Sequence, residues 1–267
     1  MTYLFHPAYP TLQHEQSAQA VVDYFKIHSE VLAVLLTCSC ARGKATRDSC
    51  LDLAVLIPPE LSQPDRYQLK HDWQSFYRSE AVFARQEEVG AFSQVDLEFH
   101  TGEFSPEDHP HGWTSGADAF ELEVGNLLAY SVLLWGKNSR YQDLQARWLP
   151  YYAEDLCRAR LKMVLKYCRN NLAHIPLYVD RGLYFQAVKR LQHAIEEFLQ
   201  CLFITRRTYP IAYDKWVREQ VVDILGLPEL YSQLVELMQI RHLESGELSE
   251  KSTLLENLIE RYLKVVG

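Results

Sequence analysis

Two apolar runs, separated by a short polar segment, constrain the fold of this chain more than any other feature. The first run spans Val31–Leu36, and the second spans Leu51–Ile57 and stops at Pro58–Pro59. Continuous apolar runs of this length are typical of strands buried on both faces. The segment between them, residues 37–50, is rich in small and charged side chains. We therefore expect two buried core strands joined by a compact loop.

The remaining pattern divides the chain into a mixed half and a helical half. Helical spacing of apolar residues predicts helices over 16–28 and 66–80, whereas Gln94–His100 alternates as a half-buried strand with Asp96, Glu98 and His100 on one face. A loop is expected over 101–116. The later segments 151–171, 181–204, 213–225 and 254–265 all have helical spacing. We predict an α+β fold, with a mixed β-sheet and helices in a domain of residues 1–140 and an all-α helical bundle in residues 141–267.

Charge and composition narrow the classes of partner. Residues 1–150 hold 11 basic and 20 acidic side chains, whereas residues 151–267 hold 16 and 15. An acidic half does not suit a duplex backbone, so nucleic acid is not an expected partner. It suits divalent metals or a cationic small molecule, unless the acidic side chains only form a solvated surface. No apolar stretch reaches the roughly 20 residues of a membrane span. The six cysteines form no CxxC framework and no secretory signal is visible, so a cytoplasmic protein is expected.

The segment between the two core strands carries the most specific pattern, TCSCARGKATRDSCLDL over residues 37–53. It resembles the nucleotidyltransferase superfamily of the polymerase-beta-like type, whose pattern is a strand, Gly-Ser, a short helix often containing Ala-Arg-Gly, and Ser-Asp-x-Asp-Leu on the next strand. Seven residues match at the family's spacing: Ser39, Ala41, Arg42, Gly43, Ser49, Asp52 and Leu53. The two-domain plan is similar to that of antibiotic nucleotidyltransferases of the kanamycin type.

The resemblance implies a reaction and a set of site residues. A nucleoside monophosphate would pass from an NTP, expected to be ATP, to a hydroxyl of a small molecule, with Mg²⁺ held by carboxylates. Asp52 and Asp96 would be the catalytic metal ligands, and Glu98, two residues further along the same strand face, is the fallback. Ser39, Arg42 and Ser49 would contact the nucleotide. An exposed strand face without function is the alternative for Asp96 and Glu98.

Two positions depart from the family pattern. The glycine of the family is Cys38 here, and its first metal-binding aspartate is Cys50. A side chain at 38 should crowd the approach of phosphate, and a thiol is a poor ligand for Mg²⁺. Three explanations follow: a catalytically inactive nucleotide-binding or regulatory homologue, an active enzyme in which the remaining carboxylates compensate, or a new role for the thiols, which with Cys40 would bind a soft metal or form a redox pair.

The resemblance also implies that the helical half binds the acceptor molecule. Glu121 or Glu123 would be the general base, and we select Glu123; a solvated acidic face is the alternative. Lys215 would contact the nucleotide from the basic, aromatic loop that also contains Arg206 and Arg207. Arg169 and His174 have the R-x4-H form of HEPN ribonucleases, which gives a weaker alternative function. The sequence leaves open the acceptor, the preferred base and whether the chain forms homo-oligomers.

Overall fold

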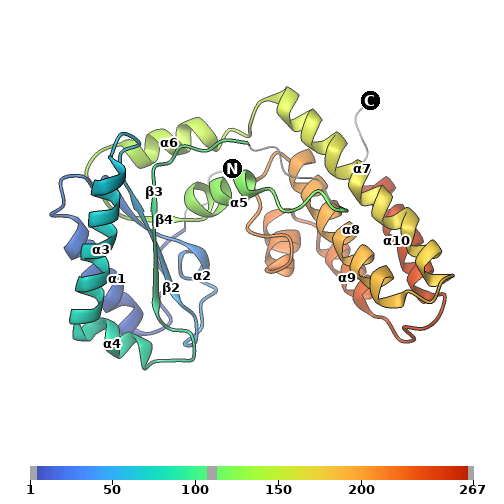
Figure 1. Cartoon of the computed structure of the whole chain (residues 1–267), viewed down its shortest axis with the longest axis horizontal. Coiled ribbons are helices and arrows are strands. Elements are labelled where there is room, and N and C mark those ends of the chain that lie inside the picture. The colour runs from blue at the N-terminus through green and yellow to red at the C-terminus, as the bar shows by residue number, and fades with distance from the viewer. Residues whose placement is uncertain (1–4, 107–112, 264–267) are drawn as a thin grey trace. The chain divides into compact units, whose positions relative to one another are not determined.

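The computed structural model describes residues 5–106 and 113–263, which form two compact units. The first unit consists of residues 1–105 and 123–150, and the second of residues 106–122 and 151–267. The predicted α+β class is confirmed, because a mixed sheet is followed by a largely helical region (Figure 1). The predicted domain boundary, between residues 140 and 141, falls within helix α6 (Arg140–Trp148) of the first unit.

The first unit is built on a four-stranded sheet with the order β3-β2-β1-β4. β2 is antiparallel to β1 and parallel to β3, and β1 is antiparallel to β4. The two apolar runs therefore form adjacent central strands, in agreement with the expectation of two core strands joined by a compact loop. The bounds are β1 Ala33–Leu36, β2 Leu51–Leu56, β3 Val95–His100 and β4 Val132–Gly136.

Helices α1, α3 and α4 cover one face of this sheet (Figure 1). Their bounds are Leu12–Phe25, Gln63–Ser79 and Ala81–Glu87. Phe25 and Trp73 from these helices join Val34, Leu53 and Val95 of the sheet in one buried cluster. The other face of β2 begins with Asp52, the only residue of that strand that is not fully buried. Burial of almost all of β2 fixes the register in which Asp52 is presented.

Local capping explains where two of these helices begin. Thr11 precedes α1 in an extended conformation, and its Oγ1 accepts a hydrogen bond from the backbone N–H of His14. Ser62 caps α3 in the same way through the N–H of Asp65, with Pro64 in the first turn. Each cap satisfies an N–H that has no partner within its helix. His14 also bonds through Nε2 to the carbonyl of Ser49, at 3.0 Å, which ties α1 to the loop before β2.

The second unit is helical over most of its described length. The segment around Ser115 is held on this unit, because the N–H of Ser115 donates to Glu197 at 2.9 Å and its hydroxyl donates to Gln200 at 3.1 Å. Buried Asp118 pairs with Arg160. The helices are α7 Glu154–Val179, α8 Tyr184–Thr205, a π-helical segment η2 Glu219–Ile224, α9 Pro228–Met238 and α10 Glu247–Tyr262.

Several elements differ from the predicted ones. β4 and α6 (Arg140–Trp148) lie in a region predicted to be helical or left unassigned, α9 was not predicted, and α10 begins seven residues before the predicted Leu254. The predicted end of α10 at Val265 lies outside the described residues. α7 contains Pro176 and ends eight residues after the predicted end at residue 171. No helix in the described ranges is long and apolar enough to cross a bilayer.

Candidate active site

The loop between β1 and β2 begins beside Asp52. The N–H of Thr37 donates to the carbonyl of Asp52 at 3.0 Å, so the chain leaves β1 next to this residue and enters the short helix α2, Cys38–Ala41. Further along, the Arg47 side chain donates to the carbonyl of Val89 at 2.7 Å, and the Asp48 carboxylate accepts from the N–H of Ala91 at 3.1 Å. These bonds tie the loop to the segment that leads into β3.

Cys38 adopts a left-handed backbone conformation, with φ of +52°. A side chain at this φ crowds its own backbone, whereas glycine adopts it readily. In the pattern that the sequence resembles, this position is glycine. The backbone at the start of α2 therefore has the conformation that suits glycine, and the cysteine side chain is accommodated there at a cost.

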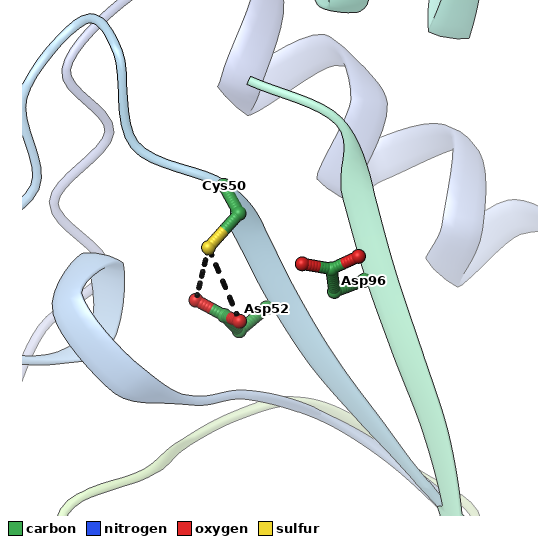
Figure 2. A group of neighbouring side chains, drawn as sticks. All are labelled: Cys50, Asp52 and Asp96. Carbon is green, nitrogen blue, oxygen red and sulfur yellow. Dashed lines mark hydrogen bonds between the residues drawn. The ribbon is translucent and has the colours of Figure 1, made fainter. Parts of the chain in front are cut away.

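Cys50, Asp52 and Asp96 converge at the start of the two parallel strands (Figure 2). Asp52 and Asp96 are paired in the register of β2 and β3, and Cys50 stands two residues before Asp52 on the same face. Each of the three side chains offers one ligand atom within 4.8 Å of the other two. The Cys50 Sγ lies 3.4 and 3.2 Å from the two carboxylate oxygens of Asp52. Among the described residues, this is the group whose geometry could hold a metal ion.

The Cys50 thiol donates a hydrogen bond to the Asp52 carboxylate in this arrangement. Burial raises the pKa of Cys50 to about 12, with further contributions from the charge of Asp52, its hydrogen bond and the charge of Asp96. Burial likewise raises the pKa of Cys40 to about 12. Both thiols are therefore protonated at neutral pH when no cation is bound. None of the six cysteines, all of which lie in the described part of the chain, forms a disulfide.

Glu98 and Glu123 both contact His100, and neither belongs to the group of three metal-competent residues described above. His100 Nε2 lies 3.3 Å from Glu98, and Nδ1 lies 3.3 Å from Glu123, which is on helix α5 (Ala119–Val124). Glu98 is exposed over 79% of its side chain and is not a member of the group around Asp52. His100 was not predicted as a partner of these carboxylates, although the alternation of β3 places it on the same face as Glu98.

Asp52, Asp96 and Glu98 also line a groove of about 720 Å³ in the first unit. β3 is an edge strand, so this groove runs along it, and α3 supplies Lys70 and Arg78 to the lining. Lys70 and Arg78 were not among the residues predicted from the sequence to contact the nucleotide. Their spacing of eight residues, with Gln74 midway, was an available signal, because residues four apart share one face of a helix.

The remaining predicted contacts lie in different surroundings. Ser39 and Arg42 are buried around α2, with 7% and 6% exposure. The Ser49 hydroxyl accepts from the N–H of Thr46 at 2.9 Å, a bond that closes the turn before β2. Lys215 is an exposed residue of the second unit, whose carbonyl accepts from the buried side chain of Gln220 at 3.0 Å.

Glu121, the second candidate base, is completely buried in the second unit. Its carboxylate accepts hydrogen bonds from the hydroxyls of Tyr151, Tyr152 and Tyr213. Burial raises its pKa, with a further contribution from Asp118. This enclosed carboxylate braces the interior of the unit, and the expectation of a solvated face does not hold for it.

Arg169 and His174 have separate partners on α7. Arg169 donates to Glu256 of α10 at 3.2 Å, whereas His174 bonds to the carbonyl of Asn170 at 2.7 Å and its ring contacts Trp113. Residues five apart point about 140° from each other around a helix. The ribonuclease alternative stays a prediction.

No family model matches the chain, and no curated protein is significantly similar to it. Among solved structures, it is similar to a nucleotidyltransferase-like protein from Exiguobacterium sibiricum 255-15, at 13% identity and a TM-score of 0.44. The match covers 92% of this chain and 74% of that one. A likeness at this level assigns no activity.

Proposed function

We propose that the chain is a nucleotidyltransferase that transfers a nucleoside monophosphate from an NTP to a hydroxyl of a small molecule. The observation that supports this most directly is the pairing of Asp52 with Asp96 on adjacent strands, beside the loop that resembles the superfamily pattern. Paired carboxylates on one sheet face are suited to hold a divalent cation, which would neutralise phosphate charge when bound. The groove beside them contains both signs of charge.

The proposed roles follow from this placement. The acceptor oxygen would attack the α-phosphorus, the bond from that phosphorus to the bridging oxygen would break, and pyrophosphate would leave. Lys70 and Arg78 would contact phosphate oxygens from α3, and Ser39 and Arg42 would do so from α2, as the resemblance implies. Glu123 contacts His100, four residues and roughly 13 Å along β3 from Asp96, so the acceptor's proton would pass to solvent rather than to Glu123.

The experiment combines each of the four NTPs with a library of small hydroxyl compounds and follows pyrophosphate release. Wild-type protein should release pyrophosphate with at least one pair, and Asp52→Asn should abolish the release. Asp155→Asn, at an exposed position of the second unit, is the matched control and should retain activity. Release that persists in Asp52→Asn would overturn the proposed site.

A catalytically silent nucleotide-binding protein is the second candidate. Two observations favour it: Cys38 puts a side chain where the family pattern has glycine, and the Cys50 thiol engages the Asp52 carboxylate. Calorimetry would then detect nucleotide binding without turnover. Restoring the family residues, as Cys50→Asp with Cys38→Gly, should create activity if this candidate is correct and the fold is otherwise competent.

A further inference from the structure

The donor set of the candidate site does not fit the ion that the resemblance implies. Mg²⁺ binds oxygen ligands in near-octahedral geometry and keeps several waters. Asp52 and Asp96 supply suitable oxygens, but the third donor is the sulfur of Cys50. Thiolates select softer or borderline cations such as Zn²⁺, and carboxylates are also ligands of Zn²⁺. One sulfur and two carboxylates together therefore suit Zn²⁺ better than Mg²⁺.

We propose that Cys50, Asp52 and Asp96 form a binding site for a thiophilic divalent cation. Zn²⁺ is the preferred ion, and Mg²⁺ competes with it only weakly. This inference rests on the same cation site as the proposed function, although it does not require that nucleotide is transferred. The thiol proton passes to solvent as the sulfur binds the ion.

The distances between donors support a tetrahedral ion. Zinc–sulfur and zinc–oxygen bonds of roughly 2.3 and 2.1 Å separate a sulfur from an oxygen by about 3.6 Å in a tetrahedral site. The Cys50 Sγ already lies 3.2 and 3.4 Å from the oxygens of Asp52. The ligand atom of Asp96 lies within 4.8 Å of both, so a small side-chain rotation closes the set.

The backbone holds these donors on ordered elements. Cys50 and Asp52 share one face at the start of β2, and Asp96 stands opposite Asp52 in the register of β3 (Figure 2). Three protein donors leave the fourth tetrahedral position to water or to a substrate oxygen. That number of ligands is typical of catalytic rather than structural zinc sites.

The test uses full-length protein that has been stripped of metal with a chelator under reducing conditions, without nucleotide. Co²⁺ serves as the probe, because thiolate ligation gives it a charge-transfer absorption in the near ultraviolet. We expect this band on titration with Co²⁺. Stoichiometric Zn²⁺ should abolish it, whereas Mg²⁺ in large excess should leave it unchanged.

Three variants locate the donors. Cys50→Ser should remove the band and weaken Zn²⁺ binding by at least about 100-fold, since loss of a direct ligand should cost no less than the loss of an outer hydrogen-bond partner. Cys38→Ser, a half-buried cysteine outside the group, is the matched control and should keep the band. Asp96→Asn, at an exposed position, should keep the band but weaken binding. Circular dichroism verifies that each variant is folded.

Two results would overturn the inference: a band that survives in Cys50→Ser, or Mg²⁺ displacing Co²⁺ as readily as Zn²⁺ does. The metal titration is independent of turnover. Absence of nucleotidyl transfer with a normal Co²⁺ band would refute the proposed function alone, and transfer supported by Mg²⁺ without a Co²⁺ band would refute this inference alone.

Discussion

Asp52 of β2 stands directly opposite Asp96 of β3 in a parallel pair of strands. Two like charges in facing positions of a sheet destabilise it unless something neutralises them. The sheet therefore carries an unfavourable pair at the same place where the chain resembles a metal-binding family. Removing one of the two charges should therefore relieve the repulsion between the carboxylates.

Asp96→Asn should stabilise the metal-free protein, by about 0.2–1 kcal/mol, because it removes one of the two facing charges. Urea denaturation followed by circular dichroism measures the change. Adding Zn²⁺ should stabilise the wild type more than the variant, since binding to the folded state alone raises its stability. A variant that is less stable than wild type without metal would show that the facing carboxylates do not repel each other appreciably.

Cys38 offers a test of backbone strain. A non-glycine residue in the left-handed region costs roughly 1–2 kcal/mol, so Cys38→Gly should be at least as stable as wild type despite glycine's greater freedom in the unfolded chain. Cys38→Ala keeps the strain and should resemble wild type, whereas the β-branched Cys38→Val should be the least stable of the series. Thermal melts give the order. A valine variant as stable as the glycine variant would contradict the strain.

Glu121 should make the stability of the second unit depend on pH. Its folded-state pKa is raised by burial, so the folded chain holds this proton above about pH 4.5, where an unfolded glutamate loses it. Its contribution to stability is thus fully present below that pH and is lost as pH rises through the raised folded pKa. Melting temperatures measured from pH 4.5 upward should fall less steeply in Glu121→Gln.

The matched control for this experiment is Glu229→Gln, an exposed glutamate of the same unit with 81% of its side chain accessible. It removes one carboxylate without touching the tyrosine cluster. The same slope in Glu121→Gln and in wild type would show that Glu121 does not govern the pH dependence.

Cys50 should react slowly with alkylating agents at neutral pH. Its pKa of about 12 leaves very little thiolate, which is the reactive form. Asp52→Asn removes a charge and alters a hydrogen bond that both disfavour the thiolate, so alkylation by iodoacetamide should become several-fold faster. Mass spectrometry of the Cys50 peptide measures the rate, with the Cys38 peptide as the internal reference. An unchanged Cys50 rate would mean that burial alone controls this thiol.

Lys70 and Arg78 should contribute to nucleotide affinity if the groove along β3 binds phosphate. A charge-assisted contact with phosphate is worth about 1.5–3 kcal/mol, so Lys70→Ala or Arg78→Ala should weaken NTP binding by about tenfold or more. Calorimetry measures the affinity, and Arg158→Ala, an exposed arginine of the second unit, is the control. Equal affinity for NTP in all three variants would show that the phosphates bind outside this groove.

The sequence predicted the centre of the sheet well because buried strands leave a clear trace. The run that became β1 is continuously apolar, the run that became β2 is interrupted only by Asp52, and β3 alternates. β4 was missed because Val132–Gly136 continues a longer apolar stretch in which helical and extended periods are indistinguishable. α7 extends past its predicted end at residue 171 and through Pro176, because a proline removes only one hydrogen bond and the buried Ile175 keeps the helix packed.

The juxtaposition of two residues of the candidate site follows from the sequence. The spacing of the superfamily pattern selected Asp52, and the alternation of β3 selected Asp96, which the structure brings together with it. The sequence suggested Cys38 and Cys40 as the partners of Cys50, whereas its neighbours in the metal-competent group are carboxylates. Side chains two residues apart on a strand share a face, so Asp52 was the closer partner.

The interleaved path of the chain between its two units sets the order in which a ribosome can complete them. β1 keeps one open edge until Val132–Gly136 emerges, and by then residues 106–122 have been synthesised while Glu197, which holds Ser115, has not. At this stage the nascent chain has an unpaired edge on β1, and the segment around Ser115 lacks its partner Glu197. Such a partly folded chain is prone to aggregation. For the same reason, no single cut yields either half intact.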